Sequence, residues 1–365
     1  MIIYALKSEQ QDKLKAIAEI DLFITEKADL IVFLAELLEK ECIVAPQSET
    51  VRTYLRENCL KDLFDYFIGI EFIDPEYEKT LHILLKFELS NEQKIIVYSS
   101  LSLMAIIKLD LNKLEEHLVK LRKLSNDAYV RFPINPLNCL DSFYYYLKYG
   151  IIKKESLMEI TRFCFKKHKR GEFKDTPSND IIFIMAVYAT IICSPQKGIR
   201  FINAINASYK NMEQTRGYGF FMNIGAADRY LRKGDTAKAL EIYNAMLAVY
   251  SKDEKIYTPI MQSLFIALKV KVSLLGNDIN EVELQFKNSM EFTAKTGYNL
   301  SRIYVLAYLL NNRKFLQQHD EFEKQVQYDF RKKLRDLDIA PEIFFRPSNF
   351  ENKKMLDQKE IHNPN

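Results

Sequence analysis

Apolar residues recur through most of this sequence at spacings of three and four residues, which is the period of an amphipathic helix. The pattern is clearest between residues 236 and 250. There one face of the expected helix collects Ala239, Ile242, Tyr243, Met246, Leu247 and Tyr250. A stripe of this width is typical of a helix that buries one face against a neighbour.

Similar stripes predict further helices along the chain. They lie at residues 8–20, 30–38, 60–70, 81–89, 95–109, 111–121, 137–149, 151–169, 181–193, 195–209, 261–275, 282–296, 303–310 and 315–330. Residues 124–137 form the longest stretch without this period in the first half. We interpret that stretch as a hinge between two sub-bodies or as a long loop.

A tight turn separates residues 217–231 from the helix at 236–250. Gly234 is suited to end the first helix in a left-handed conformation, and Asp235 is suited to accept hydrogen bonds from the free amides of the second helix. The small residues at 225–227 permit the close approach of a neighbouring helix. Together these features predict a helical hairpin with almost no loop.

This hairpin resembles a tetratricopeptide repeat, a helical unit that stacks on copies of itself. The matching positions are Ala227, Tyr230, Gly234, Asp235, Ala239, Leu240 and Tyr243. Asn223, Met246 and Ser251 stand where the family often has Trp, a second small alanine and Pro. The resemblance covers one repeat, residues 217–250.

The resemblance implies an all-α fold, a right-handed solenoid of about seven to nine stacked antiparallel helical hairpins. We expect an irregular N-terminal helical region at 1–130, a repeat region at 131–345 and a disordered polar tail at 346–365. The composition agrees with this fold class, because 10 Gly and 10 Pro in 365 residues are too few for the many turns of a sandwich or barrel.

Charge and cysteine content narrow the expected partners and compartment. Lys and Arg number 52 against 49 Asp and Glu, a net charge of +3, so direct binding to nucleic acid is not expected. The five cysteines are scattered without a C-x-x-C pair, which favours a reducing compartment. The chain start gains charge within a few residues and the apolar run 95–107 is too short to span a bilayer, so we expect a cytoplasmic protein without membrane insertion.

The sequence contains none of the common phosphate-binding, zinc-protease or nucleophile-elbow motifs. Its histidines are isolated along the chain. We therefore expect no enzymatic activity, no cofactor and no metal site.

The resemblance implies that the first helix of the hairpin lines a concave groove for a partner peptide or helix. The groove positions are Phe221, Ile224, Gly225, Asp228, Leu231 and Arg232. The family's carboxylate-clamp subtype requires Lys and Asn at several of these positions and is not supported. The groove is more apolar than that subtype, which favours a hydrophobic segment as the ligand.

Two further surfaces are candidates. Tyr144, Tyr145 and Tyr149 belong to an aromatic run that cannot all face one side of a helix, so they either contact a partner or pack between neighbouring helices. The cations Lys166, Lys167, Lys169 and Arg170 either bind an anion or an acidic partner, or simply complement a helix C-terminus.

Three functions remain open. The first is a non-enzymatic scaffold or adaptor that holds a partner segment in the groove. The second is an intracellular peptide-sensing receptor that changes its superhelical shape on binding, and the third is an enzyme on an α-helical scaffold. The identity of the partner and the oligomeric state are not encoded in any recognisable motif.

Overall fold

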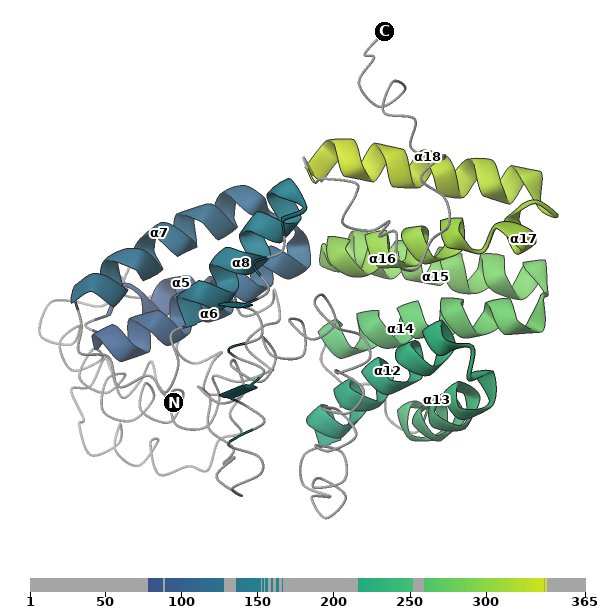
Figure 1. Cartoon of the computed structure of the whole chain (residues 1–365), viewed down its shortest axis with the longest axis horizontal. Coiled ribbons are helices and arrows are strands. Elements are labelled where there is room, and N and C mark those ends of the chain that lie inside the picture. Colours follow the sequence, from purple (N-terminus) through teal and green to yellow (C-terminus); the bar gives the residue numbers. More distant parts are fainter. Residues whose placement is uncertain are drawn as a thin grey trace, which may run out of the picture. The chain divides into compact units, whose positions relative to one another are not determined.

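The computed structural model describes residues 78–87, 89–127, 136–151, 216–251 and 259–337, with Ile339 and a few positions between 153 and 166 (Figure 1). The regular structure of these residues is helical, and no strand occurs among them. The described part of the protein is therefore all-α, as the apolar period predicts. The helices expected before residue 78 and at 181–209, and the polar tail at 346–365, lie outside the described residues.

Internal contacts divide the chain into two compact units. The first unit comprises residues 1–104, 115–140 and 157–190, and the second comprises 105–114, 141–156 and 191–365. The expected boundary at 130 falls between 128 and 135, outside the described residues, so the proposed regions 1–130 and 131–345 remain a prediction.

Four described helices lie between residues 78 and 149: α5 (Glu78–Leu84), α6 (Asn91–Lys108), α7 (Leu111–Asp127) and α8 (Pro136–Tyr149). The start of α6 is fixed by a capping box, in which the Ser90 amide donates to Gln93 Oε1 at 2.9 Å and the Gln93 amide donates to Ser90 Oγ at 3.2 Å. Such a box satisfies two amides that have no partner within the helix.

The leucine stripe of α7 is buried as predicted. Leu111, Leu114, Leu118 and Leu121 are at most 6% exposed. Some expected boundaries are wrong: α7 continues to Asp127, into the stretch without an apolar period, and α5 ends at Leu84 before a turn. The helix expected at 315–330 is divided into two, Arg313–Leu316 and Asp320–Leu337. Helical hydrogen bonding joins backbone groups and can continue through a polar turn, so the apolar stripe alone does not mark the helix end.

The second unit contains all the described helices from residue 216 onward. They are α12 (Arg216–Lys233), α13 (Thr236–Tyr250), α14 (Pro259–Ser273), the 3₁₀ turn η6 (Leu274–Gly276), α15 (Ile279–Thr296), α16 (Asn299–Asn311), α17 (Arg313–Leu316) and α18 (Asp320–Leu337). Contacts pair α12 with α13, α14 with α15 and α16 with α18. The chain thus runs through three successive helix pairs (Figure 1).

Helices α12, α14 and α16 form what we call the inner layer of this unit. α14 contacts both α12 and α16. No residue of α14 or α16 is exposed, whereas α13, α15 and α18 have exposed residues at regular intervals and form the outer layer. This difference follows from the sequence, because α14 and α16 are apolar on nearly all sides and α18 has one narrow apolar stripe.

Aromatic contacts join the layers. Phe265 of α14 is fully buried, and its ring centroid lies 5.8 Å from that of Tyr243 and 4.7 Å from that of Tyr250 on α13. Within the outer layer, Phe286 of α15 meets Phe322 of α18 edge to face, with ring centroids 5.3 Å apart. Such pairs contribute about 0.5–1.5 kcal/mol beyond the burial of their area.

The first two helix pairs share the same turn chemistry. Gly234 and Asn277 both have a left-handed backbone, with φ of 78° and 52°. The side chains of the next residues, Asp235 and Asp278, then accept hydrogen bonds from amides at the start of α13 and α15. The predicted roles of Gly234 and Asp235 are confirmed.

Residues 259–276 are long and apolar enough, by length and composition, to cross a membrane, and they are the one such helix among the described residues. α14, which makes up most of this segment, packs against α12, α15 and α16. Its apolar composition fits an interior helix of a helical array, so this observation is weak support for a membrane span.

Candidate functional site

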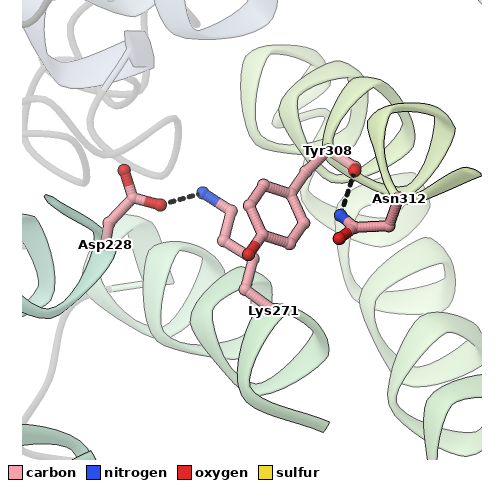
Figure 2. Close-up of polar contacts among 4 residues, drawn as sticks. All are labelled: Asp228, Lys271, Tyr308 and Asn312. Carbon is pink, nitrogen blue, oxygen red and sulfur yellow. Dashed lines mark hydrogen bonds and ion pairs between the residues drawn. The ribbon is translucent and has the colours of Figure 1, made fainter. Parts of the chain in front are cut away.

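An ion pair joins two helices of the inner layer. Lys271 Nζ of α14 donates to Asp228 Oδ1 of α12 (Figure 2). The side chains are 9% and 17% exposed, so salt and water screen the pair only weakly. Because burying charge costs free energy that the pairing offsets, the loss of one partner would leave a poorly solvated charge behind.

The third inner helix adds an aromatic ring to this pair. Lys271 Nζ lies 5.2 Å from the ring centroid of Tyr308 on α16, within the range of a cation–π interaction. The Tyr308 carbonyl oxygen accepts a hydrogen bond from Asn312 Nδ2 at 2.7 Å, at the end of α16. One polar or aromatic side chain from each of three inner helices therefore meets at one place (Figure 2).

Sequence reasoning selects Asp228 but misses Lys271 and Tyr308. The signal for Lys271 is its position in the apolar segment of α14, where a cation is costly unless it is paired. Tyr308 offers no comparable signal, because tyrosines are common between packed helices.

The predicted groove residues lie on α12, but the structure does not present them as an open apolar surface. Ile224 and Leu231 are only 7% and 8% exposed. Asp228 is half-buried in the ion pair, and the side chains of Phe221 and Arg232 lie outside the described residues. The groove remains a prediction. Among the predicted groove residues whose side chains are described, Asp228 is the one that is partly accessible.

The three candidate tyrosines of α8 contact one another. The ring centroid of Tyr145 lies 6.0 Å from Tyr144 and 5.7 Å from Tyr149, and Lys153 Nζ lies 3.3 Å above the Tyr145 ring. Tyr144 is buried, while Tyr149 is 55% exposed. Packing thus accounts for Tyr144, and Tyr149 keeps an exposed ring for which a role in binding remains a prediction.

The predicted basic cluster is described at one position only. Lys166 is in a helical conformation and its side chain is exposed. Lys167, Lys169 and Arg170 lie outside the described residues. An anion or acidic partner at this cluster remains a prediction.

Tyr98, Tyr243 and Lys333 have clearly shifted pKa values. Burial raises the pKa of Tyr98 on α6, and burial together with the Glu281 carboxylate raises the pKa of Tyr243 on α13. Burial, with the nearby Arg302 guanidinium, lowers the pKa of Lys333 on α18. These groups come from three different helices and form no described cluster, so they give the enzyme hypothesis no support.

A hollow of about 610 Å³ lies within the second unit. Its lining comprises residues 108–112, 148, 294–297, 299, 336 and 337. Asn299 Nδ2 donates to the Lys108 carbonyl oxygen at 2.7 Å and joins two sides of this lining. The charged residues that line the hollow are Lys108, Lys148, Lys295, Asp110 and Asp336, so the lysines outnumber the aspartates.

Among the described residues, no group of three or more His, Cys, Asp or Glu side chains is placed to hold a metal ion. No protein-family model, curated protein or solved structure matches the chain. Any functional assignment therefore depends on the chain's own geometry.

Proposed function

We propose that the protein is a non-enzymatic helical-repeat scaffold that binds a segment of a partner protein or peptide across the inner layer of its second unit. In this proposal the paired helices belong to a right-handed solenoid related to tetratricopeptide repeats. The partner segment would be extended or helical and would present an apolar face to the helices.

The repeated plan of the helix pairs supports the solenoid. The pairs α12–α13, α14–α15 and α16–α18 each place one helix in the inner layer and one in the outer layer. The first two pairs also use the same turn and the same aspartate cap. Repetition of one unit that buries its apolar face against the next copy is the physical basis of solenoid folds.

The meeting of Asp228, Lys271 and Tyr308 is the observation that carries the binding proposal (Figure 2). Asp228 and Tyr308 are half-buried, so each has part of its side chain accessible to a partner. A segment lying across α12, α14 and α16 would contact both residues. It would also exclude water from the ion pair, which strengthens its electrostatic attraction.

Affinity capture with matched tyrosine variants tests this proposal. Tyr308→Ala removes a ring from the inner layer, and Tyr328→Ala removes a ring that is 60% exposed on α18 in the outer layer. Bound proteins are identified by mass spectrometry, and the interaction is then measured with the purified partner. Circular dichroism and thermal unfolding establish that each variant is folded.

We expect Tyr308→Ala to lose the partner and Tyr328→Ala to retain it. If both folded variants bind equally well, or only Tyr328→Ala loses the partner, the inner layer is not the binding surface. The buried Leu231 is a poor choice for the same test, because a polar substitution there would disrupt the core.

A further inference from the structure

Two histidines that are isolated in the sequence come together in the first unit. His82 is in the last turn of α5 and His117 is on α7, and their ring centroids are 6.3 Å apart. His82 is exposed, whereas His117 is only 7% exposed. One imidazole of the pair is therefore held in the interior, and the other is accessible to solvent.

A tyrosine from the intervening helix also packs on His117. The ring centroid of Tyr98 on α6 lies 6.1 Å from that of His117. Contacts of this kind restrict the rotation of a buried ring. Burial raises the pKa of Tyr98, so its hydroxyl stays protonated at neutral pH and does not offer a phenolate ligand. The two imidazoles are therefore the side chains of this group that suit a metal ion.

The separation of the two imidazoles is close to that required by a shared ion. An ion bound to one nitrogen of each ring at about 2.0–2.1 Å would hold the ring centroids roughly 5–6 Å apart. The observed separation is slightly longer. A small rotation of the exposed His82 side chain closes this difference, because exposed side chains change rotamer readily.

We propose that His82 and His117 together bind one Zn²⁺ ion and so link α5 to α7. Neutral imidazole is the commonest metal ligand in proteins, and zinc is among the ions that it suits. Zinc prefers four ligands, so water would occupy the two other positions on the solvent side, where His82 is exposed. Binding is therefore expected to be weaker than at a structural site with four protein ligands.

This site lies in the first unit and does not depend on the partner surface proposed for the second unit. Isothermal titration of the full chain with zinc chloride, after treatment with a chelator and dialysis, tests it directly. Magnesium chloride is the comparison, because Mg²⁺ prefers oxygen ligands and is not expected to bind two imidazoles. We expect one zinc ion per chain at this site and no measurable magnesium binding there.

Substitution of either histidine is expected to weaken zinc binding about ten-fold or more, since even the loss of an outer-shell partner of a metal ligand costs about that much. His82→Gln is the principal variant, because its side chain is exposed and the substitution leaves the core intact. His117→Gln tests the second ligand in the interior. His319→Gln changes the remaining histidine among the described residues and is the matched control, with unchanged binding.

Thermal unfolding gives a second measurement. Zinc is expected to raise the unfolding temperature of the wild type and of His319→Gln, because it binds the folded protein, and to leave that of His82→Gln unchanged. The proposal is overturned if zinc does not bind the wild type, if magnesium binds equally tightly, or if His82→Gln binds zinc as the wild type does. His82→Gln alone decides the last of these outcomes, even if His117→Gln does not fold.

Discussion

Asp228 and Lys271 occupy the same position in two successive helix pairs and carry opposite charges. They are 43 residues apart, and the same interval separates the N-cap residues Asp235 and Asp278 of those pairs. A repeated backbone therefore places the two side chains next to each other on α12 and α14. The ion pair therefore joins equivalent positions of two neighbouring helix pairs, one of which carries a carboxylate and the other an ammonium group.

Removal of one partner of this pair is expected to destabilise the protein. Asp228→Ala leaves Lys271 buried without its carboxylate, at a cost of up to about 3–5 kcal/mol in the free energy of unfolding. Asp228→Leu with Lys271→Met removes both charges and is expected to be neutral or stabilising by about 1–4 kcal/mol. Urea unfolding of the variants measures both effects. Equal losses in the single and double variants would show that the pair contributes only through packing.

The fold is predicted from sequence wherever one helix face is uniformly apolar. The burial of the α7 leucines and the turn formed by Gly234 and Asp235 are both predicted from the local sequence pattern. Both predictions are confirmed. Helix ends are less well predicted, as α7 shows, because backbone hydrogen bonding continues beyond the apolar stripe.

The candidate sites depend on contacts between distant segments, and these are not visible in a local pattern. Asp228 is selected for its position in the hairpin, yet its partner Lys271 comes from the next pair. Arg302 carries the same kind of signal as Lys271, a cation within an apolar helix. Lys333 gives none, because isolated cations are frequent on helices that face water. Only the packing of α16 against α18 brings them together.

The two aspartate caps are expected to contribute similar stability. Asp235→Ala and Asp278→Ala each remove a side-chain acceptor from the first turn of a helix, at a cost of about 1 kcal/mol. Glu241→Ala changes an exposed carboxylate within α13 and is the control, expected within about 0.5 kcal/mol of the wild type. Chemical denaturation measures the three variants. A loss at only one cap would indicate that the two turns are not energetically equivalent.

A pair of glycines tests the requirement for a left-handed backbone. Gly297 has a φ of 75° at the end of α15, and nothing lies within 4 Å of an added Cβ, so Gly297→Ala is strained by its backbone alone. We expect a loss of about 1–2 kcal/mol. Gly276 also has open space but no positive φ, so Gly276→Ala is expected to be neutral or to stabilise by about 0.4–1 kcal/mol. Similar unfolding midpoints for the two variants would contradict the assignment of the cost to φ.

The pKa of Lys333 gives a pH-dependent prediction. Its pKa in the folded protein is lowered from 10.5 by burial and by Arg302, so the unfolded chain holds the proton more tightly. The destabilising effect of the charged side chain is complete below the lowered pKa and disappears as the pH rises toward 10.5. Lys333→Met is therefore expected to be more stable than the wild type at neutral pH, by a margin that shrinks at alkaline pH.

Urea unfolding measures this difference in stability between Lys333→Met and the wild type. Both proteins are unfolded in phosphate-free buffer at neutral pH and at several alkaline pH values. The comparison of two proteins at each pH cancels the titration of tyrosines and other lysines that both contain. Lys324→Met serves as the control, because this lysine is on the same helix, α18, and is exposed. A margin that stays constant with pH, or a Lys333→Met protein less stable than the wild type at neutral pH, would show that the burial of the Lys333 charge and its repulsion by Arg302 do not affect folding.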